Sequence, residues 1–313
     1  MGTTSADELN TLTFCDTRAG AVIEKRPYGK TGLSVSALGL GAGQVGDSRL
    51  SEADAAALLS VTVDAGINLI DTAPSYGLSE QRIGRYLGSR RADTVLSTKL
   101  GYGVEGIENW TGPCITAGIE QALRILRTDR IDIAHLHSCP RETLERGDVV
   151  DALERAKRAG KIRAMAYSGE NEDLAFAVAM QRFDGFMASL NICDQRVIAD
   201  TLPNLGGRGF IAKRPSANHP WRFARRPTGD YCEAYWLRWQ AMRLSSHAFE
   251  WGELAIRFAL SIPGVACAIV GTGSTEHLFE NIAWASTGPL DAAIVRELQE
   301  AFAAHDEQWL GQI

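Results

Sequence analysis

The chain has 313 residues, of which 45% are hydrophobic and 22% charged, and its formal net charge is −6 at pH 7. This composition is typical of a globular protein with a large buried core and excludes a disordered or fibrous chain. The acidic balance argues against nucleic acid or anionic lipid as a partner, and no apolar run approaches the ~20 residues of a membrane span. We therefore expect a cytoplasmic protein that binds neither nucleic acid nor a membrane.

Residues 1–22 lack the basic and apolar segments of a secretory signal, and we expect them to form a loose tail before a single domain over residues 23–313. Six cysteines lie far apart without a C-x-x-C pair, so free thiols are expected. They are Cys15, Cys114, Cys139, Cys193, Cys232 and Cys267. Only His135 and His137 lie close together among the six histidines, so no metal site is expected.

From residue 36 onward, short β-branched runs alternate with longer segments of helical period. Strands are expected at 36–40, 68–71, 94–98, 131–136, 162–167, 185–190, 209–212 and 266–270. Helices are expected at 51–64, 79–87, 115–126, 148–159, 171–180, 249–261 and 275–283. This alternation predicts an α/β fold, a (β/α)8 TIM barrel. Residues 26–35 (RPYGKTGLSV) predict an N-terminal β-hairpin that plugs the barrel bottom, and residues 213–247 predict a long loop after strand seven.

Residues 41–46 (GAGQVG) match G-x-G-x-x-G, the glycine string of many dinucleotide-binding βαβ units. In that fingerprint the last glycines open a helix directly, so that the helix N-terminus meets the pyrophosphate. Here the helix pattern begins only at Ser51. We therefore interpret the string as the end of the first barrel strand and its loop, where Gly41 and Gly43 leave room at the rim.

Four polar side chains follow successive strand ends, where a parallel barrel carries its active site. Asp71 ends the second strand, Tyr76 lies on the following loop, Lys99 ends the third strand and His137 the fourth. Taken singly, each would more often be structural, as a helix cap, a surface charge or a satisfied core histidine. Their convergence on one rim favours a catalytic site. His135 lies one layer deeper and is expected inside the barrel.

The four residues suit the delivery of a proton to a carbonyl group that receives a hydride. A tyrosine is a weak acid at neutral pH, and we expect the Lys99 ammonium to lower the pKa of Tyr76. An ion pair with Asp71 would keep Lys99 protonated. His137 would hydrogen-bond the carbonyl oxygen and orient the substrate.

The chain resembles the aldo-keto reductase family over roughly residues 23–300. In chain order, the motifs that carry the resemblance are RPYGKTGLSVSALGLG, DAGINLIDTAPSYG, STK, RIDIAHLHS, GKIRAMAYSG and GTGSTEHLFEN. The resemblance implies an NAD(P)(H)-dependent oxidoreductase that reduces an aldehyde or ketone, or oxidises the alcohol, without a metal. It also implies that Asp71, Tyr76, Lys99 and His137 form a catalytic tetrad, with Tyr76 as general acid or base.

The resemblance further implies where the cofactor binds. The expected cofactor-binding residues are Gly41, Gly43, Ser168, Asn191, Lys213, Arg214, Gly271, Thr272, Gly273, Ser274, His277, Glu280 and Asn281. Amides at the start of the last of these segments would suit a phosphate. NADP(H) is the expected cofactor, with NAD(H) as the alternative.

Three positions depart from the family pattern. Met187 stands where the family has a glutamine for the nicotinamide carboxamide, so that contact would shift to Ser168, Ser189 or Asn191. Lys213 replaces an aromatic residue that commonly stacks on the nicotinamide, so a cation or an aromatic from elsewhere would take its place. His277 replaces an arginine that often grips the 2′-phosphate.

The substrate is expected to be a small carbonyl compound or alcohol, with Trp110 and Trp221 as candidate pocket walls. Two other functions fit the same barrel. One is a Schiff-base lyase with Lys99 as its nucleophile. The other is a non-catalytic, cofactor-sensing regulatory subunit, which the family also contains. No sequence feature indicates a particular oligomeric state.

Overall fold

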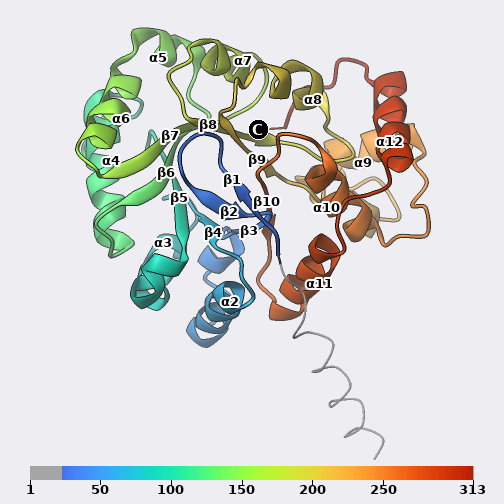
Figure 1. The fold of residues 1–313 in the computed structure, drawn as a ribbon, viewed down its shortest axis with the longest axis horizontal. Helices are drawn as coiled ribbons and strands as arrows, with labels where there is room; N and C mark the ends of the chain where they lie inside the picture. The colour runs from blue at the N-terminus through green and yellow to red at the C-terminus, as the bar shows by residue number, and fades with distance from the viewer. Residues whose placement is uncertain (1–22, 313) are drawn as a thin grey trace, which may run out of the picture.

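A computed structural model describes residues 23–312, so the expected tail at residues 1–22 lies outside the described residues. Eight parallel strands close into a barrel that helices surround (Figure 1), which confirms the predicted fold. In barrel order the strands are β10 (Cys267–Gly271), β3 (Leu38–Gly41), β4 (Leu69–Asp71), β5 (Val95–Leu100), β6 (Ile131–His137), β7 (Ile162–Ser168), β8 (Gly185–Ser189) and β9 (Gly209–Lys213).

The seven expected helices are present. They are α2 (Glu52–Asp64), α3 (Ser79–Tyr86), α4 (Gly112–Ile125), α6 (Asp148–Arg158), α7 (Asn171–Ala179), α10 (Trp251–Ser261) and α11 (Thr275–Ser286). Further helices lie outside the expected ranges or inside the expected loop. These are α5 (Arg141–Arg146), α8 (Arg196–Asp200), α9 (Glu233–Met242), α12 (Ala292–His305) and the 3-10 turns η1 (Gln44–Gly46), η2 (Gly88–Asp93), η3 (Leu202–Asn204) and η4 (Pro220–Arg222).

The long loop after β9 is therefore partly helical. Helix α9 buries Tyr235, Arg238 and Met242, which have helical spacing. The middle residue is charged, so the segment has no continuous apolar stripe. That interruption explains why the sequence pattern did not place a helix there.

The predicted hairpin forms from β1 (Lys25–Pro27) and β2 (Ser34–Ser36), which pair antiparallel. Tyr28, in its turn, is fully buried. A Cβ at Gly185 or Gly209, the first residues of β8 and β9, would overlap the Tyr28 ring. Because these glycines lie at the N-terminal ends of their strands, the ring closes the bottom of the barrel, as expected.

Apolar side chains fill the barrel interior as a cluster separate from the layer between strands and helices. His135 also lies inside, fully buried, with Nε2 3.1 Å from Ser97 Oγ, as predicted. The five cysteines within residues 23–312 are buried free thiols, and Cys15 lies outside the described residues. No helix in this part of the chain has the length and apolar character needed to cross a bilayer.

Candidate active site

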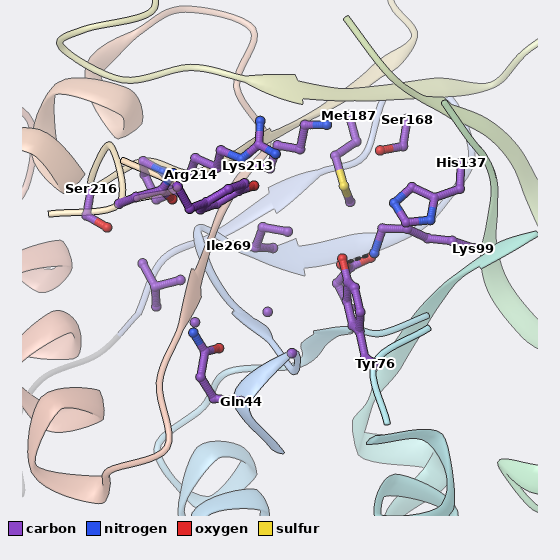
Figure 2. Close-up of a pocket in the computed structure, with 18 of the residues that line it drawn as sticks. Gln44, Tyr76, Lys99, His137, Ser168, Met187, Lys213, Arg214, Ser216 and Ile269 are labelled. Atoms are coloured by element: carbon purple, nitrogen blue, oxygen red, sulfur yellow. Dashed lines mark hydrogen bonds and ion pairs between the residues drawn. The ribbon is translucent and has the colours of Figure 1, made fainter. Parts of the chain in front are cut away.

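A cavity of about 610 Å³ opens at the C-terminal ends of the barrel strands (Figure 2). The structure brings all four predicted tetrad residues together on its wall: Asp71, Tyr76, Lys99 and His137. They come from β4, the loop after it, β5 and β6, which are neighbours in the barrel. The position is the one that a (β/α)8 barrel normally uses for its active site.

A buried ion pair lies at the base of this wall. Lys99 Nζ is 2.5 Å from Asp71 Oδ2 and donates to the Thr72 carbonyl at 2.9 Å, while Ser97 Oγ donates to Asp71 Oδ1 at 2.7 Å. The two charged side chains are 2% and 1% exposed. Burial alone would lower the pKa of Lys99, but the charge of Asp71 and the hydrogen bonds to Asp71 and Tyr76 outweigh it and raise that pKa. Lys99 is therefore an ammonium at neutral pH, as expected.

Tyr76 is half-buried, and Lys99 Nζ lies 4.8 Å from the centre of its ring. Burial raises the pKa of the phenol, while the charge of Lys99 and its hydrogen bond lower it; the net shift is upward. Lys99 acts in the expected direction, but desolvation of the phenolate exceeds the stabilisation that Lys99 provides, so the pKa is raised and not lowered. The hydroxyl is consequently protonated, which is the form that donates a proton.

Close packing of two glycines fixes the Tyr76 loop. A Cβ at Gly46 would overlap the Tyr76 carbonyl, and a Cβ at Gly77, whose φ is 54°, would lie 2.5 Å from the Gly46 oxygen. Leu78 N donates to the Gly46 carbonyl at 3.0 Å. The last glycine of the G-x-G-x-x-G string thus supports the catalytic loop. Helix α2 begins only at Glu52, so the context of a dinucleotide fingerprint is absent, as interpreted.

His137 ends β6 and faces the cavity. Burial, followed by the charges of Lys99, Lys213 and Arg214, lowers the pKa of His137 to about 3, so the ring is neutral. The Tyr102 hydroxyl makes a short hydrogen bond with His137 Nδ1. Sequence reasoning missed Tyr102, although it lies two residues beyond the end of β5 and so belonged among the rim candidates.

Six of the expected cofactor-binding residues line the cavity: Gly41, Gly43, Ser168, Lys213, Arg214 and Gly271. The others do not line it. Asn191 is buried, donates to the Arg214 carbonyl at 3.0 Å and accepts from Cys193 N at 2.8 Å. The remaining six occupy the turn after β10 and the first turns of α11; they are Thr272, Gly273, Ser274, His277, Glu280 and Asn281.

The start of α11 differs from the expected phosphate site. Ser274 is the N-cap, and its side chain accepts from the amides of Glu276 and His277 at 3.1 and 3.4 Å. Two of the amides expected to meet a phosphate therefore already have a partner within the chain.

A second buried ion pair lies on the other side of the cavity, between Lys213 Nζ and Glu170 Oε1 at 3.1 Å. The same carboxylate oxygen accepts from the amide and the hydroxyl of Ser189 at 2.9 and 2.8 Å. Burial, with repulsion from Arg214 and Lys99, lowers the pKa of Lys213 despite Glu170. Ser189 and Asn191 therefore already have hydrogen-bond partners within the chain.

Ser168 is different, because its buried hydroxyl has no hydrogen-bond partner among residues 23–312 and lines the cavity beside Met187. Asn218 Nδ2 is likewise buried and unpaired on the cavity wall. Four cationic side chains line the cavity against two acidic ones. Unpaired polar atoms and positive charge fit a nicotinamide dinucleotide, for which Ser168 would be available to the carboxamide, and Arg214 with the loop after β9 to the phosphates.

The loop after β9 supplies further residues that line the cavity. They are Pro215, Ser216, Asn218, His219, Asp230 and Tyr231, together with Arg222. The Arg214 guanidinium lies 5.0 Å from the centre of the Tyr231 ring, so an aromatic side chain does reach this wall from elsewhere in the chain.

The two tryptophans proposed as pocket walls do not line the cavity. Trp221 stacks on Trp251, with ring centroids 6.0 Å apart. Trp110 packs edge-on against Tyr102 at 6.1 Å and lies just behind the cavity wall.

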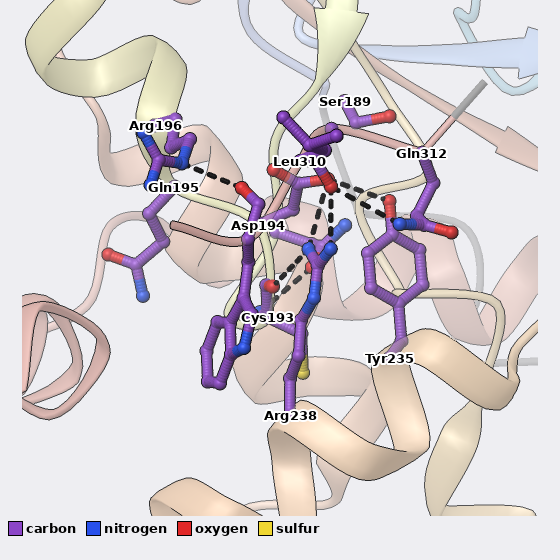
Figure 3. Close-up of polar contacts among 12 residues, drawn as sticks. Ser189, Cys193, Asp194, Gln195, Arg196, Tyr235, Arg238, Leu310 and Gln312 are labelled. Carbon is purple, nitrogen blue, oxygen red and sulfur yellow. Dashed lines mark hydrogen bonds and ion pairs between the residues drawn. The ribbon is translucent and has the colours of Figure 1, made fainter. Parts of the chain in front are cut away.

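Hydrogen bonds hold residues 306–312, the segment after α12, against residues next to the cavity (Figure 3). Arg238 donates to the Leu310 carbonyl at 2.5 Å and to the Cys193 carbonyl at 3.2 Å, and Arg214 donates to the Gln312 carbonyl. Asp194 accepts from Tyr235 at 3.0 Å. Although Arg238 and Tyr235 lower it, burial and the charge of Glu170 raise the pKa of Asp194 to about 7.

No group of three or more His, Cys, Asp or Glu side chains in residues 23–312 is placed to hold a metal ion. The side chains of the cavity include a protonated tyrosine, an ion-paired lysine and a neutral histidine. They can donate and accept protons and hydrogen bonds at a substrate oxygen.

Comparisons with known proteins agree with this geometry. Residues 37–189 match the model of the aldo/keto reductase family. The chain is 29% identical to L-galactose dehydrogenase of Arabidopsis thaliana, over 83% of this chain and 88% of that protein. It is 28% identical to D-threo-aldose 1-dehydrogenase of a Pseudomonas species, over 86% and 95% of the two chains.

Among solved structures, one from Pseudomonas aeruginosa described as an aldo-keto reductase is 30% identical, with a TM-score of 0.69. The similarity covers 87% of this chain and 98% of that one. Sequence motifs, barrel topology and these similarities point to one family, whose members use NAD(P)(H). The chain therefore belongs to the aldo/keto reductase family of NAD(P)(H)-dependent oxidoreductases.

Proposed function

We propose that this protein is an NADP(H)-preferring oxidoreductase that interconverts a carbonyl compound and its alcohol, with Tyr76 as the general acid or base. The observation that carries the proposal is the array of Tyr76, Lys99 and Asp71 on one cavity wall. Lys99 lies 4.8 Å from the Tyr76 ring centre and 2.5 Å from Asp71 Oδ2. Such an array couples a proton donor to a buried positive charge.

Each residue has a separate part in the reaction. The bound nicotinamide supplies or accepts the hydride. In reduction, the Tyr76 hydroxyl donates its proton to the carbonyl oxygen as that oxygen gains negative charge. Lys99 stabilises the resulting phenolate, and Asp71 keeps Lys99 charged. His137, which is neutral, donates a hydrogen bond to the same oxygen, and alcohol oxidation uses the steps in reverse.

We further propose a polyhydroxylated substrate of the aldose class. Ser138, next to His137, and Asn218, whose buried Nδ2 is unpaired among the described residues, both line the cavity and can hydrogen-bond sugar hydroxyls. Two relatives are named for dehydrogenation of an aldose, L-galactose dehydrogenase and D-threo-aldose 1-dehydrogenase. On such a substrate the reaction would oxidise C1: the hydride would pass to the oxidised cofactor, and the hydroxyl proton to Tyr76 in its phenolate form, which Lys99 stabilises.

The preference for NADP(H) follows from the charge of the cavity. Lys213, Arg214 and Arg222 all line it, and an additional phosphate gains from such cations. His277, the position where an arginine would grip that phosphate, is exposed on the first turn of α11. We therefore expect a moderate preference rather than exclusion of NAD(H).

Two observations bear on the other candidate functions. A Schiff-base nucleophile must be an unprotonated amine, whereas Lys99 is ion-paired to Asp71 and its pKa is raised. A regulatory subunit has no need of a complete proton-donating array. Both observations favour the oxidoreductase.

The test is a panel of aldoses, other alcohols and small aldehydes assayed at 340 nm with NADP(H) and NAD(H) side by side. Tyr76→Phe should abolish turnover while cofactor fluorescence titrations give a nearly unchanged Kd. Retained turnover in that variant would overturn the assignment of Tyr76. A borohydride-trapped adduct on Lys99 would establish the lyase instead.

A further inference from the structure

We propose that Tyr102 is a positioning residue that sets the tautomer of His137: its hydroxyl donates to Nδ1, so the ring proton resides on Nε2. This inference rests on the proposed function, because the Nε2 proton is the one that we expect to meet the substrate oxygen. It assigns a part in the reaction to a residue outside the tetrad.

The contacts of the two rings support this arrangement. The Tyr102 hydroxyl bonds His137 Nδ1, and its centroid lies 5.5 Å from that of the imidazole at a tilt of 30°. It also lies 3.1 Å from Ser75 Oγ. Among the described residues, His137 makes no other hydrogen bond that would fix its ring proton, so Nε2 is left for a ligand.

The surroundings of His137 keep the ring uncharged. Lys99, Lys213 and Arg214 all act on it electrostatically and disfavour an imidazolium. The Tyr76 ring faces it edge-on at 6.4 Å. A neutral imidazole carries one N–H donor and one acceptor nitrogen, and the bond at one nitrogen decides the state of the other.

The direction of the Tyr102 hydrogen bond therefore decides what Nε2 can do. If Tyr102 donates to Nδ1, it accepts from Ser75, and Nε2 carries the proton. If Nδ1 donated to Tyr102, Nε2 would be an acceptor and would oppose the lone pairs of a carbonyl oxygen. Because a carbonyl oxygen only accepts, the first arrangement is the one compatible with reduction.

The backbone and a tryptophan hold Tyr102 in this position. Trp110 N donates to the Gly101 carbonyl at 2.7 Å, and the Trp110 ring covers Gly101 so closely that a Cβ there would overlap it. The same ring packs edge-on against Tyr102 at an interplanar angle of 65°. Trp110, proposed from the sequence as a pocket wall, thus supports the residue that orients His137.

The direct test is the nitrogen-15 NMR spectrum of the full-length protein labelled on its histidines, with His137→Asn used to assign the signal. In the wild type we expect His137 to be neutral between about pH 6 and 8, with an unprotonated Nδ1 and a protonated Nε2. Tyr102→Phe should move both nitrogen shifts towards a mixture of tautomers. Tyr86→Phe, which removes a hydroxyl bonded to Glu52, is the matched control and should leave both shifts unchanged.

Kinetics supply a second readout. Tyr102→Phe keeps the ring and should lower kcat by about tenfold or more, with the cofactor Kd unchanged. A wild-type ring protonated on Nδ1, or an unchanged tautomer in Tyr102→Phe, would overturn the proposal. An inactive wild type with the expected tautomer would instead count against the proposed function, because the NMR measurement needs no turnover.

Discussion

Two walls of one cavity are built in different ways. We name the strand wall by Asp71, Tyr76, Lys99 and His137, and the loop wall by Ser168, Lys213, Arg214, Asn218 and Tyr231. The strand wall comes from the neighbouring strands β4, β5 and β6 and the loop after β4, whereas the loop wall combines the ends of β7 and β9 with the loop after β9. That loop is held by contacts such as Arg214 with Gln312, 98 residues apart. Under the proposed function, the barrel itself would position the proton donor, and tertiary contacts would assemble the cofactor site.

The two lysines of the cavity show the contrast in the directions of their pKa shifts. Burial acts against both ammonium groups, yet the pKa of Lys99 is raised and that of Lys213 is lowered. Lys99 is 2.5 Å from Asp71, while Lys213 shares Glu170 with Ser189 at 3.1 Å and is repelled by Arg214. The two lysines therefore have opposite pKa shifts: the Asp71 charge outweighs burial at Lys99, whereas Glu170 does not outweigh burial and the repulsion from Arg214 at Lys213.

The largest expected effect is at the centre of the strand wall. Lys99→Met should lower kcat by about 10³-fold, because Tyr76 loses the charge that stabilises its phenolate. It should also lower the free energy of unfolding by roughly 3–5 kcal/mol, because Asp71 remains buried without its partner. Steady-state kinetics and urea unfolding measure both effects.

Two further variants make this prediction specific. Asp71→Asn combined with Lys99→Met should recover much of the stability but none of the activity. Lys213→Met, the matched change on the loop wall, should raise the cofactor Kd more than it lowers kcat. If Lys213→Met instead reduced kcat as strongly as Lys99→Met, the division of labour between the walls would be wrong.

The next effect is a pH dependence of the free energy of unfolding, which arises from Asp194 beside the loop wall. The pKa of Asp194 is raised from 3.8 to about 7, so the folded state binds the proton more tightly than the unfolded chain. Protonated Asp194 therefore adds its full contribution to the free energy of unfolding below about pH 4, and this contribution is lost as the pH rises to about 7. The loss is on the order of 3–4 kcal/mol.

His137 acts in the opposite sense. Its pKa in the folded state is about 3, so the free energy of unfolding falls as the pH drops from 6.5 towards 3.

Urea unfolding of the wild type and Asp194→Asn across pH 4–8 isolates the first contribution. The difference in unfolding free energy between the two proteins should change steadily from pH 4 to 7 and then level off. Parallel curves for the two proteins would show that Asp194 is ionised in the folded state like an ordinary carboxyl.

A backbone change tests how the strand wall holds Tyr76. Gly46→Ala should lower kcat by about 10²-fold, because the new Cβ displaces the Tyr76 carbonyl and shifts the hydroxyl. Gly88→Ala is the matched control, since its Cβ would meet nothing within 4 Å and its φ is not positive. Equal kinetics for the two variants would contradict the supporting part assigned to Gly46.

The smallest effect lies away from both walls. The Tyr28 hydroxyl is buried and has no hydrogen-bond partner among the described residues. Tyr28→Phe should therefore stabilise the protein by about 1 kcal/mol in urea unfolding and leave kcat and cofactor affinity unchanged. A destabilised Tyr28→Phe variant would mean that the hydroxyl has a hydrogen-bond partner. Altered kinetics would mean that packing at the barrel bottom affects the cavity at the other end.

The sequence was sufficient for the barrel and for the residues brought together on the strand wall. Asp71, Lys99 and His137 lie at or next to the ends of short apolar runs, and parallel strands bring such ends to one rim. Tyr76 follows Asp71 closely enough to remain there. In these cases a local pattern and the fold topology determine the position together.

The loop wall could not be predicted in the same way. Glu170 and Lys213 follow or end β7 and β9, which are separated in the barrel by β8, so no pairing pattern connects them. Arg238 is charged but occupies a buried position, so the apolar residues of α9 do not recur with the period of a helix. The hydrogen bond between Tyr102 and His137 depends on how the loop after β5 turns at Gly101. The glycine in the sequence does not by itself specify that turn.

The hairpin at the barrel bottom has a consequence for the order of folding. β1 and β2 pair locally, but Tyr28 rests on Gly185 and Gly209, and β3 pairs with β10. At about 5–20 residues per second, synthesis separates Tyr28 from Gly209 by roughly 10–35 s. Tyr28 and the outer edge of β3 therefore stay unburied until β9 and β10 have been synthesised.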